Sequence, residues 1–201
     1  MGLWISLAVF AVIIIALLLF VVGIYNKLVT LKNRYLNSFA QIEVQLKRRH
    51  DLSPNLVETV KGYMSHEQET LERVIASRNT AASLLSAASK NPSDATAMTA
   101  LAGAQGALSS AVGGLMAVME AYPDLKADSQ STMLQEELTS TENKIAFARQ
   151  SYNDSVTTYN SYRQSFPPVV LAPMVGHPSD AAFLEFEDSA QIQHAPSAAL
   201  D

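Results

Sequence analysis

The stretch from Leu3 to Ile24 limits the possible folds more than any other part of this chain, because it contains no charged residue and is apolar except for Ser6 and Gly23. An α-helix rises about 1.5 Å per residue, so about 20 residues match a hydrocarbon core about 30 Å thick. No basic n-region precedes the run, no Ala-x-Ala site follows it, and it is longer than the apolar part of a signal peptide. The sequence therefore predicts a transmembrane anchor over residues 1–24. The span residues singled out are Leu3, Trp4, Phe10, Phe20 and Ile24.

Basic residues follow this span but do not precede it. Lys27, Lys32 and Arg34 lie directly after the apolar run. Because the side of a membrane protein with more lysine and arginine tends to face the cytoplasm, the body is expected to be cytoplasmic and these three residues to flank the lipid. Lys47 to Arg49 are interpreted differently, as a solvated helix end.

The first helix is expected to be a long rod. Neither proline nor a loop cluster separates the span from Leu28, Leu31, Tyr35 and Ile42, whose spacing of three, four and seven residues forms one helical stripe. The rod is expected to be about 50 residues and about 75 Å long. It is predicted to end near Ser53 and Pro54, which suit the cap and the first position of a second helix.

The rest of the body reads as three more helices. The second is expected from Pro54 to about Lys90, where Asn91 to Asp94 end it, and the third from there to about Ala121. The fourth is expected to begin between Asp128 and Ser131 and to stop at Phe166, Pro167 and Pro168. Short turns between amphipathic helices, with almost no strand signals, predict an all-α fold: an antiparallel up-and-down four-helix bundle over residues 25–166 that continues the transmembrane helix.

The third helix carries very small side chains on the face opposite its leucines. Each glycine inside a helix costs about 1 kcal/mol relative to alanine, so the face needs a compensating contact. We expect it to pack against a second copy of the chain, as small-residue faces do in helix pairs. The alternative is an exposed helix that tolerates its glycines. The residues of this face are Gly103, Gly106, Ser110, Gly113, Gly114 and Ala117.

Residues 167–201 differ in composition from the helical body. No Lys or Arg follows Arg163, and prolines occur at 167, 168, 173, 178 and 196. Such a segment cannot build a core alone and is expected to be a flexible, acidic tail. Phe183, Leu184 and Phe186 are concentrated between acidic residues, so a short docking segment for a membrane-protein partner is expected there.

The sequence offers no convincing catalytic, cofactor or metal site. The chain has no cysteine, and His50 and His66 lie too far apart to share a metal, so both are interpreted as solvated histidines at helix ends. His177 and His194 are assigned to the tail without ligand partners. Paired carboxylates such as Glu136 and Glu137 fall at polar positions, where nothing creates the desolvated pocket that acid catalysis needs. Tyr152 and Tyr159 are expected to pack in the core.

Several short motifs resemble one known family. They are Tyr25 to Val29, the stretch Gln41 to Gly62, Gly62-Tyr63, His66 to Glu72, Tyr122 to Lys126, Thr141 to Ile145, Tyr152-Asn153, Tyr159-Asn160 and Phe166-Pro167. In this order they resemble the LemA family of membrane-anchored bacterial helical proteins, over roughly residues 1–170. The resemblance implies a helical body and an anchor in the bacterial inner membrane, but no reaction. The added prolines and the Ala-Pro-Ser-Ala-Ala end depart from the family pattern.

A binding role is therefore expected rather than an enzymatic one. The favoured function is a structural or scaffolding protein that forms homo-oligomers on membrane lipid. The alternatives are an adaptor or regulatory subunit of another membrane protein, such as a protease or sensor, and a module that shapes or senses lipid. The net charge of -5 is too small to suggest a nucleic-acid partner.

Overall fold

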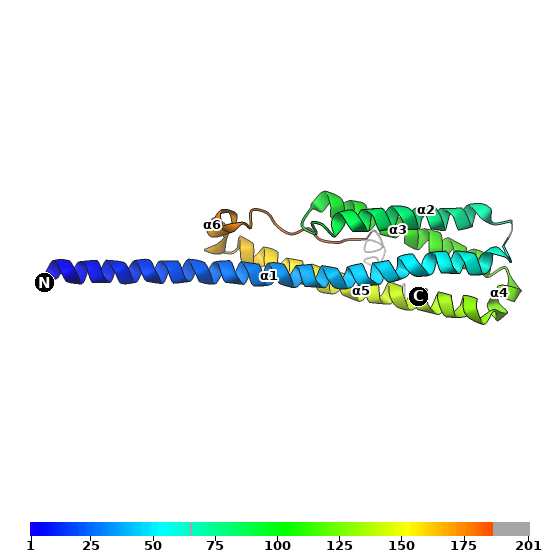
Figure 1. Ribbon diagram of the computed structural model, residues 1–201, viewed down its shortest axis with the longest axis horizontal. Helices are drawn as coiled ribbons and strands as arrows, with labels where there is room; N and C mark the ends of the chain where they lie inside the picture. The colour runs from blue at the N-terminus through cyan, green and yellow to red at the C-terminus, as the bar shows by residue number, and fades with distance from the viewer. Residues whose placement is uncertain (65, 187–201) are drawn as a thin grey trace, which may run out of the picture.

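The computed structural model describes residues 1–64 and 66–186. The fold is all-α, as predicted, and the described residues contain no strand. The long helices lie side by side (Figure 1), and short helices follow the last of them. The helices are α1 (Gly2–Lys61), α2 (Gln68–Ala88), α3 (Ala95–Met119), α4 (Pro123–Ala127), α5 (Ser129–Gln164), α6 (Pro168–Leu171) and the 3-10 helix η1 (Ala172–Val175).

Helix α1 is one uninterrupted helix of 60 residues. At about 1.5 Å per residue it is about 90 Å long. Its N-terminal third projects beyond the other helices (Figure 1), and the large apolar side chains between Met1 and Val22 are exposed. Burial begins at Ile24, which is 5% exposed. The prediction that the apolar span continues directly into the helical body is confirmed.

The predicted turn at Ser53 and Pro54 is wrong, because α1 continues to Lys61. Proline has no N–H and leaves the carbonyl of the residue four positions earlier without its helical donor. Here that carbonyl belongs to His50, and Arg78 Nε of α2 donates to it at 2.9 Å. Ser53 does not cap a helix; its buried hydroxyl donates to the Arg49 carbonyl at 2.8 Å. The chain turns instead after Lys61.

The later helix starts follow from side-chain caps. Asp94 accepts from the backbone N–H groups of Thr96 and Ala97, which fixes the start of α3. Asp128 accepts from the Ser131 N–H at 2.8 Å and caps α5, at the predicted start of the fourth helix. Both caps satisfy N–H groups that the first helical turn leaves unpaired.

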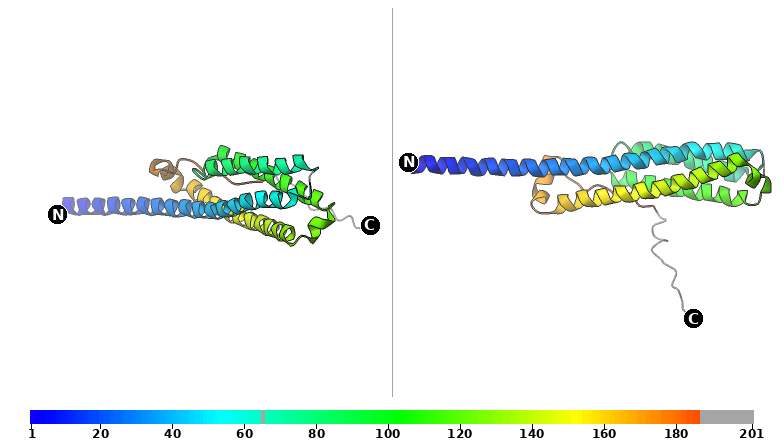
Figure 2. Two further views of the ribbon diagram at one scale, coloured as in Figure 1. Left: turned by 45° about the vertical axis from the view of Figure 1, so that its right-hand side comes forward. Right: turned by 90° about the horizontal axis from the view of Figure 1, so that it is seen from below.

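The long helices alternate in direction and enclose two successive apolar cores. Figures 1 and 2 show α1 running beside α5, and α2 beside α3. The first core lies nearer the projecting end of α1 and includes Ile24, Tyr35 and Tyr152, while the second includes Leu56, Leu108 and Leu138. The rings of Tyr152 and Tyr159 each contact the ring of Tyr35 edge to face in the first core, so these two tyrosines of α5 are packing residues.

Residues 165–186 return along the bundle. Helices α6 and η1 form a cap beside α1, and Gly176 takes the left-handed conformation at φ 86° to end η1. Residues 177–186, called the return segment below, are extended and run back along α5. Asn160 exchanges two hydrogen bonds with the Ala181 backbone, at 2.8 and 3.0 Å. Asn153 does the same with Leu184, at 3.0 and 3.1 Å. Two side-chain amides on α5 therefore hold the segment as a neighbouring strand would.

This packing corrects one expectation about the tail. His177 was expected to lie in a flexible tail, but it is buried at 4% exposure and its Nδ1 lies 3.0 Å from the Tyr159 hydroxyl. Burial lowers the pKa of His177. His194 and the rest of residues 187–201 lie outside the described residues.

Candidate functional site

A polar cluster lies inside the bundle where α1, α2, α3 and α5 meet. Its members are Arg49, His50, Ser53, Arg78, Gln105, Ser109 and Glu142. Arg49, His50, Ser53 and Gln105 are all at most 3% exposed. Two sequence expectations are thereby corrected, because neither Arg49 nor His50 is a solvated helix-end residue. Both face inward because the helical stripe of Ile42 and Leu46 continues through position 49 and the unbroken α1 keeps its register.

Arg49 ties three helices together. One of its terminal nitrogens lies 2.9 Å from a Glu142 oxygen of α5. The other donates to the Ser109 hydroxyl of α3 at 2.6 Å and to the Gln105 carbonyl at 3.3 Å. A guanidinium carries five donors, so several acceptors are needed to bury it. Glu142 is 45% exposed, which places the ion pair at the edge of the core rather than at its centre.

His50 is held as a neutral imidazole. Its Nε2 lies 3.1 Å from the side-chain amide nitrogen of Gln105. Burial lowers the pKa of His50 to about 4, and the cations Arg49 and Arg78 act in the same direction, while the contact with Gln105 opposes the shift. At neutral pH the cluster therefore contains one buried cation and an uncharged histidine.

The contacts of this cluster are those of a group that stabilises helix packing rather than of a reaction site. His50 contacts an amide, not a hydroxyl or thiol that it could activate as a base. Within residues 1–64 and 66–186, no group of three or more acidic or histidine side chains is placed to hold a metal ion. Arg49 contacts Glu142, Ser109 and the Gln105 carbonyl, and Arg78 donates to the His50 carbonyl, so the cluster connects four helices.

The predicted span residues lie on the projecting part of α1. Leu3, Trp4, Phe10 and Phe20 are exposed, whereas Ile24 is buried at the start of the first core. Among helices of the described chain, α1 and α3 are long and apolar enough to cross a membrane; the apolar window of α1 is 6% buried and that of α3 is 44% buried. Helix α3 is thus a core helix, and α1 carries the uncovered apolar surface.

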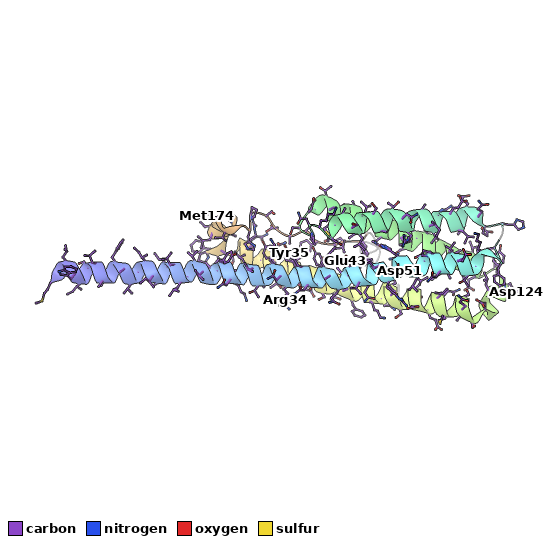
Figure 3. The ribbon with its side chains drawn as sticks, in the orientation of Figure 1. Arg34, Tyr35, Glu43, Asp51, Asp124 and Met174 are labelled. Atoms are coloured by element: carbon purple, nitrogen blue, oxygen red, sulfur yellow. The ribbon has the colours of Figure 1, made fainter. Side chains whose placement is uncertain are left out.

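The basic residues after the span lie on α1 just inside the bundle. Lys27 and Arg34 are exposed and Lys32 is half-buried. Arg34 lies on α1 near Tyr35 in Figure 3.

The described part of the chain leaves the small-residue face of α3 uncovered. Gly103, Ser110, Gly113, Gly114 and Ala117 are exposed and Gly106 is half-buried. A Cβ atom placed on any of the four glycines would meet nothing within 4 Å. The opposite face, with Leu101, Leu108 and Leu115, is fully buried. Within residues 1–64 and 66–186, no contact accounts for the four glycines.

The three residues predicted as a docking segment are divided between core and surface. Leu184 is fully buried and Phe186 is 5% exposed, and both belong to the first core of the chain itself. The Arg149 guanidinium lies 4.5 Å above the Phe186 ring. Phe183 is the exposed member, at 42%.

The sequence reasoning missed the buried polar residues. A signal was present, because Arg49, Ser53 and Leu56 continue the stripe of Ile42 and Leu46 in steps of three and four. Gln105 likewise falls between Leu101 and Leu108 on the apolar face of α3. Position in the stripe, rather than residue type, marks these side chains as buried.

An all-α body on a long helix with an uncovered apolar N-terminal stretch defines a membrane-associated helical protein. The LemA family profile matches residues 38–198, and the chain belongs to the LemA family.

The chain is also similar to magnetosome proteins named MamQ. It is 26% identical over 170 residues to MamQ of Magnetospirillum gryphiswaldense, covering 76% of this chain and 61% of that protein. It is 36% identical over 77 residues to MamQ 1 and to MamQ 2 of Paramagnetospirillum magneticum, covering 38% of this chain and 28% of each. The chain thus spans less than two thirds of the length of these relatives.

Proposed function

We propose that this protein is a non-enzymatic scaffold, anchored by a single span in the bacterial inner membrane, whose cytoplasmic body assembles with further copies of itself. The anchor is the exposed apolar stretch that ends at Ile24. The positive-inside tendency, through Lys27, Lys32 and Arg34, supports the cytoplasmic placement of the body.

The uncovered small-residue face of α3 is the observation that carries this proposal. Its four glycines weaken the helix by about 1 kcal/mol each relative to alanine. Among the described residues, nothing lies within 4 Å of a Cβ atom placed at any of them. Small side chains allow a second helix backbone to approach closely, and the dispersion attraction between the two closely packed helices offsets the cost.

The test is the mass of the full-length protein in lipid nanodiscs, compared with the double variant Gly106→Leu/Gly113→Leu. The wild-type chain is expected to form a discrete assembly, and the variant to be monomeric because two bulky side chains keep the backbones apart. Leucine is a better helix former than glycine at exposed positions, so unfolding does not explain such a loss. Ala87→Leu, at an exposed position of α2, is the control for added apolar surface and should assemble normally.

A monomeric wild-type protein, or a double variant that assembles like the wild type, would contradict the proposal. The placement of the body is tested separately with a reporter fused after Asp201. Activity of a reporter that works only outside the cytoplasm would overturn the cytoplasmic placement and leave the assembly unaffected.

An adaptor role for another membrane protein is the second candidate, favoured by the exposed ring of Phe183. Phe183 projects from the return segment, whereas its neighbour Leu184 is buried. In that case Phe183→Ser would abolish capture of one membrane partner and leave the mass of the purified protein unchanged.

A further inference from the structure

The end of the bundle nearest the span carries an exposed apolar surface. The chain has no charged residue from Gln164 to Ser179. Within this stretch Phe166 is 82% and Met174 79% exposed, and Val169 and Val170 are also exposed. Soluble surfaces rarely gather apolar side chains in this way without a contact partner.

These side chains lie close to the point on α1 where the exposed apolar stretch ends and the buried core begins. Helix η1 lies beside α1, and Ala172 is buried in the same core as Ile24. The ring of Tyr25 lies 6.4 Å from that of His177, just after η1. Figures 1 and 2 show α6 at the end of the bundle from which α1 projects, and Figure 3 places Met174 at that end.

That level corresponds to the surface of a bilayer. If residues 3–24 fill the hydrocarbon core, Ile24 lies at its edge and Tyr25 among the lipid headgroups. Side chains beside Tyr25 therefore face the interfacial region. Apolar side chains at this depth can be buried in the interfacial region of the bilayer without any further change in the fold.

We propose that Phe166, α6 and η1 form a second membrane contact, which seats in the headgroup region beside the span. This membrane-proximal cap rests on the proposed single-span anchor. Its occupant is the lipid surface because the cap lies beside α1 where the exposed apolar stretch ends, and because exposed Lys27 lies close by on α1 to meet anionic headgroups. One span alone leaves the tilt of a helix free, and a second contact fixes it.

Side-chain contacts keep the cap in place. Arg163 Nε donates to the His177 carbonyl at 3.0 Å, and Arg163 also forms an ion pair with Asp180 at 2.6 Å. The Tyr159 hydroxyl contacts the His177 ring. Contacts from α5, together with that of Tyr25 from α1, therefore hold the chain directly after the cap.

The test uses fluorescent labels on single cysteines, which the cysteine-free chain allows without other changes. Val170→Cys and Met174→Cys carry the label on the cap, in full-length protein in nanodiscs of phosphatidylethanolamine and phosphatidylglycerol. Phe147→Cys is the matched control, because Phe147 is 75% exposed and lines a surface hollow with Arg34 and Ser38. That hollow lies about 15 to 20 Å further along α1 than Ile24. Leu18→Cys reports on the span itself.

Labels at positions 170 and 174 are expected to lose emission when the lipids carry a quencher near the headgroup, and to be shielded from iodide in the water. The label at position 147 should show the reverse. Iodide quenching of the cap labels equal to that at position 147 would overturn the proposal. Shielding from iodide without quenching by lipid would also overturn it, since protein would then cover the cap.

The label at position 18 separates this proposal from the proposed function. Quenching by lipid at position 18 but not at 170 and 174 leaves the anchor in place and rejects the cap contact alone. No quenching by lipid at position 18 rejects the anchor and the cap contact together. Neither result depends on the mass of the assembly.

Discussion

The buried polar residues show how single side chains are stabilised inside this bundle. Arg49 lies on the apolar stripe of α1, which faces the core. Its guanidinium forms an ion pair with Glu142 and donates hydrogen bonds to two neutral acceptors of α3. His50 occupies the adjacent position in its neutral form. An unmatched cation at either position would cost several kcal/mol, so the pairing explains why the residues are tolerated.

The low pKa of His50 makes the stability of the fold depend on pH. In the unfolded chain the imidazole titrates near 6.5, whereas in the folded chain burial lowers its pKa to about 4. Between these values the unfolded state binds a proton that the folded state does not. The free energy of unfolding is therefore expected to fall by about 3 kcal/mol as the pH is lowered through this window. Urea unfolding at a series of pH values measures it.

The contribution of His50 is isolated by substitution. His50→Gln keeps a polar group near Gln105 but does not titrate, so the variant should lose less stability than the wild type between pH 6.5 and about 4. His66→Gln, at an exposed position, is the control and should follow the wild type. Carboxylates titrate in all three proteins and cancel in the comparison. A His50→Gln profile parallel to the wild type would show that the ring protonates without opposing folding.

At the scale of the helix, Pro54 is tolerated because Arg78 replaces a missing backbone donor. Arg78→Met would leave the His50 carbonyl without that donor and is expected to lower the free energy of unfolding by about 1 to 2 kcal/mol. In a Pro54→Ala background the restored N–H supplies the donor, so the same substitution should cost less. A double-mutant cycle by urea unfolding measures this coupling.

The matched control for this cycle is Arg73→Met. Arg73 is exposed and forms only a surface ion pair with Glu69, so its loss should have an effect of about 0.5 kcal/mol or less. Equal costs for Arg78→Met in both backgrounds would mean that the hydrogen bond does not compensate for Pro54.

The contrast between Pro54 and Asp128 shows which features the sequence could supply. The cap of α5 at Asp128 is local, within three residues of the N–H that it accepts, and its position was predicted correctly. The continuation of α1 past Pro54 depends on Arg78, which follows in sequence only after a turn and half of α2. Rules based on neighbouring residues cannot predict a hydrogen-bond donor such as Arg78, which comes from a different helix. The buried position of Arg49 was detectable, because the stripe of three and four residues runs through it.

The return segment was missed for a related reason. An extended chain lying on a helix has no periodicity of its own to reveal it. Its position is set by Asn153 and Asn160, which lie seven residues apart on one face of α5 and pair with backbone groups three residues apart. Two helical turns span about the same distance as three extended residues, which makes this match possible.

At the scale of the whole molecule, the return segment connects the membrane-proximal end to the first core. It begins beside Ile24 and Tyr25 and ends with Leu184 and Phe186 buried against α5. The orientation of the cap relative to the rod therefore depends on contacts along the whole segment. Residues far from the bilayer can influence how the protein sits on it.

Releasing the return segment should loosen one part of the molecule and leave the rest folded. Asn160→Ala removes both hydrogen bonds to Ala181, at an expected local cost of about 1 to 3 kcal/mol. Because about 1.4 kcal/mol corresponds to a tenfold change in an equilibrium, the Ala181 amide should exchange its hydrogen about ten to a hundred times faster. Amides of α2 and α3 should keep their protection, since the second core is untouched. Hydrogen exchange measured by mass spectrometry separates the two regions.

Asn143→Ala, at an exposed position of the same helix, is the control and should leave exchange in the return segment unchanged. The double variant Asn153→Ala/Asn160→Ala should extend faster exchange to Leu184, because its backbone pairing is lost as well. Faster exchange across all four long helices would mean that the segment stabilises the entire fold. Unchanged exchange at Ala181 would mean that packing of Leu184 and Phe186, rather than the asparagine amides, holds the segment. The first core would then be sufficient to set the position of the cap.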